Sequence, residues 1–264
     1  MLIICNGTFK SGSSWLHAIL IELLRIKKIS LSSVPDHYTN DIHSPTKIIE
    51  SKIDEFIFNE SFDTHNYLTK SHFFKISTLS SPYPDTVKFL FVERDIKDAI
   101  VSHYYHIQNK FRKQISFRMY YFFLGRYKAY EIYLFNERCK RYFGLTNFIL
   151  YHDLKNSFNI VINKLCDILQ LDQLNRSEMQ QLIDETTIEK LREKSKIGEL
   201  EYYPSRRHDN WKQFRTGLEG DWKHHFSDSQ LSHIEKIESG NASFFLRFIY
   251  FMIFSCRRYI FNIE

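Results

Sequence analysis

The sequence of 264 residues predicts an α/β protein in which a central parallel sheet is flanked by helices. Three short apolar runs, residues 2–5, 87–92 and 148–151, are bounded by turn residues and have the length of buried strands. Amphipathic helical patterns lie between these runs. Strands that alternate with helices favour a parallel sheet, which binds ligands in the loops at the carboxyl ends of its strands.

Two helical patterns accompany the predicted strands. The first begins near Ser14, and the second opens at Asn156 and Ser157. Apolar residues recur at the spacing of one buried helix face, at positions 16, 19, 20, 23 and 24 in the first helix and 160, 161, 165, 168 and 169 in the second. Capping-box patterns predict two further helix starts, at Thr186-x-x-Glu189 and Ser227-x-x-Gln230.

The composition fits a single domain over residues 1–264. A hydrophobic share of 43% is enough for a substantial core. The net charge of +5 suits anionic ligands, but it is spread along the chain, so we expect no nucleic-acid groove. The four cysteines are isolated and lack metal-site spacing, which predicts a reducing compartment. We find no signal peptide and no membrane-spanning stretch, and we expect a soluble, cytoplasmic protein.

A small-residue loop with the features of an anion site follows the first predicted strand. It spans residues 7–16 and reads Gly-Thr-Phe-Lys-Ser-Gly-Ser-Ser-Trp-Leu. Backbone N–H groups and the dipole of the next helix converge there, and the hydroxyls of Ser11, Ser13 and Ser14 add donors. The loop fits GxxxxGK[ST] except that Ser13 occupies the lysine position and Lys10 lies three residues too early. This mismatch argues against ATP chemistry with magnesium.

A second phosphate site is predicted where the run 87–92 ends. Arg94 follows this strand, and Ser102 lies about two helical turns further along. The arginine can offer a charge-assisted fork, and the serine of the next helix can bring a hydroxyl to the same phosphate. The sequence therefore predicts two anion sites, each directly after a strand.

These motifs resemble, in the same order, those of the sulfotransferases that use 3′-phosphoadenosine 5′-phosphosulfate (PAPS). Residues 9–16 resemble the family's PKSGTTWL loop, with Phe9 in place of proline, and residues 94–104 resemble RNPKDVAVSYY. Two further segments match family patterns, residues 70–72 (KTH) and 215–223 (RKGxxGDWK). Two others resemble them: residues 151–155 resemble YEDMK, and 186–191 resemble TSFxxM, with Ile188 in place of an aromatic residue. The resemblance covers residues 1 to about 226 and implies a P-loop-like phosphosulfate loop.

The resemblance implies three catalytic side chains. His72 occupies the position of the family's general base, and a neutral imidazole with a pKa near 6.5 suits proton removal from an acceptor at physiological pH. Lys10 and Lys70 would compensate for negative charge that grows on the bridging oxygen and the sulfuryl group. The motifs contain no paired carboxylates for a metal, so we expect no metal requirement.

The resemblance also implies which residues hold PAPS and its product PAP. The 5′-phosphosulfate would lie against the loop residues Lys10, Ser11, Gly12, Ser13 and Ser14. The nucleoside would contact Trp15, which is expected to stack on adenine, and Tyr151, Thr186 and Ile188. The 3′-phosphate would be held by Arg94, Ser102, Arg215 and Gly217; Thr216 replaces the usual lysine of this segment, so one phosphate cation is lost.

The likeness fails in the C-terminal segment, residues 227–264, which we predict to be helical and divergent. Residues 244–261 are apolar on nearly every helical face and include Arg247, Arg257 and Arg258. Three roles fit this pattern: a helix that caps the core, a homodimer interface, or a helix that lies on a membrane surface.

The sequence thus predicts an enzyme that transfers a sulfuryl group from PAPS to a hydroxyl or amine. Small molecules, glycolipids and saccharides are all open as acceptors, and the 24 Phe and 16 Tyr residues favour an apolar or aromatic one. Two alternatives are a nucleotide or small-molecule kinase that uses the loop at 7–14, and a non-enzymatic sulfotransferase-like binding protein.

Overall fold

The computed structural model describes residues 1–39, 48–60, 62, 64–72, 83–111, 114–197 and 217–255, which fall into two compact units. The first unit comprises Met1–Arg94 and Cys139–Gly217, and the second comprises Asp95–Arg138 and Leu218–Glu264. The chain therefore passes between the units three times, after Arg94, Arg138 and Gly217. That residues 1–264 act as one domain stays a prediction.

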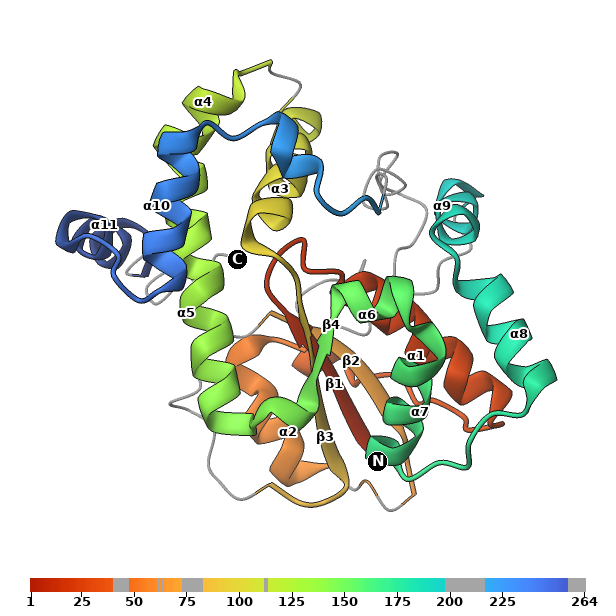
Figure 1. Cartoon of the computed structure of the whole chain (residues 1–264). Coiled ribbons are helices and arrows are strands. Elements are labelled where there is room, and N and C mark those ends of the chain that lie inside the picture. The colour runs from red at the N-terminus through yellow and green to blue at the C-terminus, as the bar shows by residue number, and fades with distance from the viewer. Residues whose placement is uncertain are drawn as a thin grey trace. The chain divides into compact units, whose positions relative to one another are not determined.

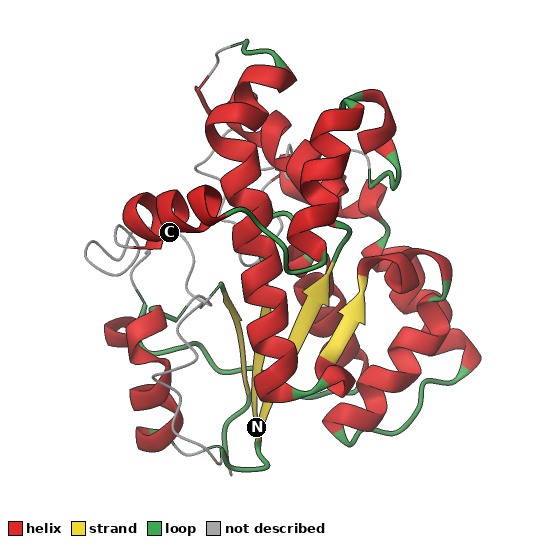
Figure 2. Ribbon diagram, turned by 60° about the vertical axis from the view of Figure 1, so that its left-hand side comes forward, coloured by secondary structure: helices red, strands yellow, loops and turns green. Residues whose placement is uncertain are grey.

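Four parallel strands form the sheet of the first unit, in the order β2-β1-β3-β4 (Figure 1). They are β1 (Leu2–Gly7), β2 (Tyr67–Ser71), β3 (Val87–Glu93) and β4 (Phe148–Leu150). The strands run side by side in one direction (Figure 2). The predicted α/β fold with a central parallel sheet is confirmed. The structure adds β2, which no apolar run had indicated, and it assigns Tyr151 to the next helix rather than to β4.

The side chains of the strands alternate between two apolar layers. Ile3 and Cys5 point to one face, where they join a buried cluster with α1 (Ser13–Ile26) and α7 (Phe158–Leu169). Phe91 of β3 belongs to the other face, where its ring lies 4.9 Å from that of Phe143. Successive strand residues point to opposite sides, so both faces of this sheet are covered, as is usual for all-parallel sheets.

The remaining helices of the first unit connect and flank the strands. They are η1 (Asp36–Tyr38), η2 (Glu50–Lys52), α2 (Ile53–Asn59), η5 (Leu145–Asn147), α6 (Tyr151–Asn156), α8 (Arg176–Thr186) and α9 (Ile188–Ile197). The capping box predicted at Thr186 is wrong, because Thr186 ends α8. The next residue instead accepts a hydrogen bond at Thr187 Oγ1 from the N–H of Lys190, at 3.2 Å.

The second unit is helical in its described part. Its elements are α3 (Ile96–Phe111), α4 (Phe117–Tyr120), η4 (Tyr121–Gly125), α5 (Arg126–Phe143, which continues into the first unit), η7 (Asp221–His224), α10 (Asp228–Glu238), α11 (Phe244–Ile249) and η8 (Tyr250–Ser255). The predicted capping box of Ser227 and Gln230 is confirmed at the start of α10. Among the helices described, none combines the length and apolarity needed to cross a membrane.

The C-terminal helix has apolar side chains on two sides. Leu246 and Tyr250, one helical turn apart, are buried. Phe244, Phe248 and Phe251 form an outer stripe at the same helical spacing, with exposed fractions of 83%, 49% and 61%. The described part of this helix therefore has one buried and one exposed apolar side. Its contact with a second copy or a membrane surface stays a prediction.

Two isoleucines of α7 have opposite environments. The predicted buried stripe included Ile160, which is 71% exposed, whereas Ile162 is fully buried in the cluster beneath the sheet. Removing buried methyl and methylene groups costs about 2–5 kcal/mol, because a cavity remains. We expect Ile162→Ala to lower the free energy of unfolding in urea by this amount. Ile160→Ala is the matched control and should change it by about 0.5 kcal/mol or less; equal losses would contradict the assigned face.

A buried histidine of α1 makes stability depend on pH. Burial, with a smaller effect of the Lys70 charge, lowers the pKa of His17 from 6.5 to about 3. The unfolded chain takes up a proton near pH 6.5 and the folded chain does not, so stability falls as pH decreases below 6.5. At about pH 4.5 the loss amounts to about 2–3 kcal/mol.

Replacing this histidine should therefore reduce the acid sensitivity of the fold. We expect the free energy of unfolding of His17→Leu to fall less than that of the native protein between pH 6.5 and about 4.5. His152→Leu replaces an exposed histidine and serves as the control. Parallel pH curves for the native protein and His17→Leu would refute the linkage.

Candidate active site

Residues of the predicted site follow all four strands at one edge of the sheet. Lys10 follows β1, His72 follows β2, Arg94 follows β3 and Tyr151 follows β4. Because β1 lies between β2 and β3, the strand order reverses at this point. Open α/β sheets bind ligands outside the carboxyl ends of their strands where such a reversal occurs. The topology thus brings together residues that are far apart in the sequence.

The loop after β1 has the backbone of an anion-binding turn. Lys10 and Gly12 have positive φ values, 60° and 105°. Gly12 is the N-cap of α1, no side chain caps the helix, and the first turn contains no acidic residue. The first N–H groups of a helix have no acceptor within the helix. The start of α1 therefore offers N–H donors and the positive end of its dipole to an anion.

A buried hydroxyl in the same loop fits an anion with several oxygens. Ser11 is fully buried, and its Oγ has no hydrogen-bond partner among the described residues. A buried hydroxyl without an acceptor costs free energy, which a phosphate or sulfate oxygen in the loop would offset. The loop also admits no larger residue at Gly12, where a Cβ atom would lie 2.5 Å from Cδ2 of Tyr151.

Two predicted catalytic side chains bond to this loop. Lys70 of β2 donates from Nζ to Oγ of Ser14 at 2.6 Å. His72 donates from Nδ1 to the carbonyl oxygen of Gly7 at 2.6 Å. A carbonyl oxygen can only accept, so Nδ1 carries the proton and Nε2 of the neutral ring is the basic nitrogen.

Arg94 and two aromatic rings also lie near this loop. The Arg94 guanidinium lies over the ring of Tyr151, with Cζ 4.3 Å from the ring centroid, and its NH1 donates to the Lys10 carbonyl at 3.5 Å. The ring of Tyr151 meets the edge of Trp15, with the centroids 5.6 Å apart. Trp15 is buried, and its Nε1 donates to the Thr186 carbonyl at 2.8 Å. These five positions form one contiguous set.

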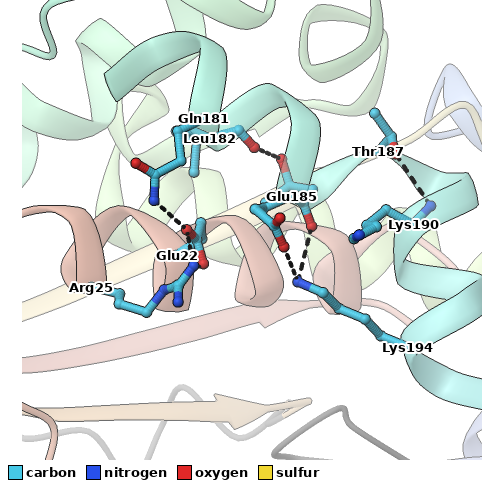
Figure 3. Close-up of polar contacts among 9 residues, drawn as sticks. Glu22, Arg25, Gln181, Leu182, Glu185, Thr187, Lys190 and Lys194 are labelled. Atoms are coloured by element: carbon cyan, nitrogen blue, oxygen red, sulfur yellow. Dashed lines mark hydrogen bonds and ion pairs between the residues drawn. The ribbon is translucent and has the colours of Figure 1, made fainter. Parts of the chain in front are cut away.

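Polar contacts join α8 to α1 and α9 to α8 (Figure 3). Thr186 is the last residue of α8. The Gln181 amide donates to Oε1 of Glu22 at 3.4 Å, which joins α8 to α1. Lys194 of α9 pairs with Glu185 of α8 at 2.5 Å. The hydrogen bond from Trp15 of α1 to Thr186 of α8 therefore joins two helices that a further polar contact also connects.

Gly217 lies near the hydroxyl group of Tyr151, the residue whose ring Arg94 covers. It has a φ of 63°, and a Cβ atom there would lie 2.2 Å from Cδ1 of Ile188 and 3.5 Å from the hydroxyl oxygen of Tyr151. Lys155 donates from Nζ to the Gly217 carbonyl at 3.0 Å. Lys155 was not among the predicted site residues, although it ends the 151–155 motif, and that position was the available signal.

The structure collects most of the predicted site in the first unit. These residues are Lys10, Ser11, Gly12, Ser13, Ser14, Trp15, Lys70, His72, Arg94, Tyr151, Thr186, Ile188 and Gly217. Ser102 is buried in α3 of the second unit. Arg215 and Thr216 lie outside the described residues. Within the described ranges, no group of three or more His, Cys, Asp or Glu side chains could hold a metal ion.

Comparison with known proteins identifies the family. A model of the sulfotransferase domain matches residues 2–241. Flavonol 3-sulfotransferase of Flaveria bidentis is 25% identical over 258 residues, which cover 86% of this chain and 77% of that protein.

Two solved structures have a similar fold. Mouse sulfotransferase SULT7A1, complexed with PAP, aligns with a TM-score of 0.59 and 20% identity over 97% of this chain and 88% of its own. Retinol dehydratase, in complex with androsterone and PAP, aligns with a TM-score of 0.60 and 16% identity over 91% and 80% of the two chains. These two likenesses show the fold, and the family model confirms the predicted enzyme class: the chain belongs to the sulfotransferase domain family as a PAPS-dependent sulfotransferase.

Proposed function

We propose that this sulfotransferase transfers a sulfuryl group from PAPS to a hydroxyl or amine of a small apolar or aromatic acceptor, with His72 as the general base. The observation that carries the proposal is the hydrogen bond from His72 Nδ1 to the Gly7 carbonyl. This bond holds the imidazole ring beside the loop and directs the basic Nε2 away from the loop backbone. A base must be fixed within reach of the proton that it removes.

The donor is held by groups of three kinds. The N-terminus of α1 and the Ser11 hydroxyl suit the 5′-phosphosulfate, because both supply donors to an anion. Arg94 and the Gly217 backbone suit the 3′-phosphate. Arg94 lies over the Tyr151 ring, and a Cβ atom at Gly217 would lie 3.5 Å from the Tyr151 hydroxyl, so both residues are near Tyr151; this supports one site for the two ends of the nucleotide. The adenine base would lie beside Trp15, Thr186 and Ile188. The proposed nucleotide-binding residues also include Ser102, Arg215 and Thr216.

The chemistry needs a proton acceptor and positive charge. PAPS supplies the sulfuryl group: the acceptor oxygen or nitrogen forms a bond to sulfur, the bond from sulfur to the bridging phosphate oxygen breaks, and the acceptor proton passes to His72 Nε2. The ammonium groups of Lys10 and Lys70 stabilise the negative charge that develops at the bridging oxygen and the sulfuryl group. The bond from Lys70 to Ser14 supports this role, because it holds the ammonium at the start of α1.

The acceptor class is inferred from relatives and composition. One curated relative is a flavonol sulfotransferase, and one structural neighbour was solved with androsterone. Both names denote small apolar molecules with hydroxyl groups, which agrees with the Phe- and Tyr-rich sequence. We therefore favour a small phenol or alcohol over a glycolipid or a saccharide.

A reducing, cytoplasmic compartment suits the enzyme. Cys5 and Cys166 are buried free thiols. Burial raises the pKa of Cys5 to about 12, so this thiol stays protonated and unreactive at neutral pH.

Transfer assays with labelled PAPS test the function directly. A panel of phenols, aliphatic alcohols, amines, glycolipids and saccharides would identify the acceptor class, and we expect a phenol or alcohol to be sulfated. PAP should raise the melting temperature of the protein, whereas ATP with magnesium should not. Stabilisation by ATP and magnesium alone, without sulfate transfer, would instead support a kinase.

The role of His72 can be separated from nucleotide binding. We expect His72→Ala to lower kcat by about 10²–10⁴-fold, the usual effect of losing a general base, with PAP affinity nearly unchanged. His152→Ala, at an exposed site on α6, should keep full turnover. Near-native kcat in His72→Ala would remove this residue from the proposed mechanism.

The role of Arg94 can be tested with two nucleotides. Loss of a charged hydrogen-bonding group costs about 1.5–3 kcal/mol, so Arg94→Ala should weaken PAP binding by about 10–100-fold. Binding of adenosine 5′-monophosphate, which lacks the 3′-phosphate, should change little. Arg94→Lys keeps the charge without the planar guanidinium fork, so its PAP affinity should lie between those of the native protein and Arg94→Ala. Equal losses for both nucleotides, measured by calorimetry, would contradict a contact with the 3′-phosphate.

A further inference from the structure

We infer that Asp98 is a positioning residue for the nucleotide 3′-phosphate, because its buried carboxylate fixes the backbone that follows Gly217. This inference rests on the proposed role of Gly217 in holding that phosphate. Asp98 belongs to the 94–104 motif and Gly217 to the 215–223 motif, which the sequence did not relate to each other. The hydrogen bonds of the second unit connect the two motifs.

The Asp98 carboxylate binds two backbone N–H groups. Its Oδ2 accepts from the N–H of Gly220 at 2.9 Å, and its Oδ1 accepts from the N–H of Trp222 at 3.4 Å. The side chain is only 4% exposed. A buried carboxylate is stable only when its charge is compensated, and hydrogen bonds to a charged acceptor are stronger than those between neutral groups. These hydrogen bonds therefore restrain the backbone at 220–222 in this position.

The carboxylate itself is rigidly placed. Asp98 lies in the first turn of α3, where Oδ1 of Asp95 accepts from the N–H groups of Lys97 and Asp98 at 2.7 and 3.3 Å. A negative charge in the first turn is also favoured by the helix dipole. The start of α3 is thus a fixed point for the segment that it binds.

The bound segment is shaped to receive these bonds. Gly220 precedes η7 as its N-cap and has a φ of 79°, a backbone conformation that residues with a Cβ atom rarely adopt. The ring of Trp222 lies near the ammonium group of Lys97, 5.2 Å from its centroid. The neighbouring α3 residues Lys97 and Asp98 therefore contact the same short stretch, one through a ring and one through the backbone.

The stretch from Gly217 to Trp222 is held at both ends. In the first unit, Lys155 binds the Gly217 carbonyl. In the second unit, Asp98 binds the N–H groups of Gly220 and Trp222. Asp98 lies four residues after Arg94, and Gly220 lies three residues after Gly217, so these bonds tie together two segments that leave the first unit. Their loss should increase the freedom of the Gly217 peptide. The expected consequence is weaker binding of the phosphate that this peptide contacts.

The experiment compares two nucleotides that differ at the 3′ position. Affinities of PAP and adenosine 5′-monophosphate are measured by calorimetry for the native protein, Asp98→Asn and Gly220→Ala. Gly220→Ala disturbs the same backbone without altering the carboxylate, and it keeps the test valid if Asp98→Asn fails to fold. Glu131→Gln is the control, because Glu131 is a buried carboxylate of the same unit that pairs with the Lys128 side chain at 2.6 Å.

We expect both test variants to bind PAP about tenfold or more weakly, the scale of losing a charged hydrogen bond, with unchanged affinity for adenosine 5′-monophosphate. KM for PAPS should rise while kcat changes little, and Glu131→Gln should match the native protein. A purely structural role would weaken both nucleotides equally, and this result, or unchanged PAP affinity, would overturn the inference. If the native protein bound PAP no more tightly than the monophosphate, the proposed nucleotide site itself would be wrong, and the inference with it.

Discussion

The parallel pairing of β1 with β2 and β3 is the constraint on which the active site depends. It sets Asn6 level with both Ser71 and Phe91, so the segments that follow these strands begin at the same edge. His72 can then reach the Gly7 carbonyl directly. Main-chain hydrogen bonds along three strands thus fix the position of His72 relative to the loop that follows β1.

The loop itself combines several locally unfavourable features. Lys10 adopts a left-handed conformation, the start of α1 lacks a side-chain cap, and the Ser11 hydroxyl is buried without a partner among the described residues. Each feature costs free energy in the absence of an anion and is relieved by a group rich in oxygen. Such features persist because the surrounding core, with both faces of the sheet covered, determines the backbone there. These features support the proposed role of the loop in binding an anion, and they lower the local stability of the protein without one.

Sequence patterns were reliable where they depended on neighbours along the chain. The apolar runs of β1 and β3, the loop between strand and helix, and the capping box of Ser227 all follow from local periodicity and local hydrogen bonding. They were unreliable where a shift of one residue changes the outcome. Ile160 has the sequence spacing of the apolar stripe but is exposed to solvent. Thr186 begins a capping-box sequence pattern but is the last residue of α8. The packing of neighbouring elements selects among such close alternatives.

The sequence by itself determined the fold class, the order of the motifs and the kinds of side chain that could bind a doubly phosphorylated nucleotide. Only the tertiary structure decided which atoms these side chains use: Nδ1 of His72 on Gly7, Lys155 on Gly217, and Asp98 on Gly220. Each of these bonds ends on a backbone group more than sixty residues away or in a different motif. Every residue carries the same backbone N–H and C=O groups, so no sequence pattern marks the one that a distant side chain will reach.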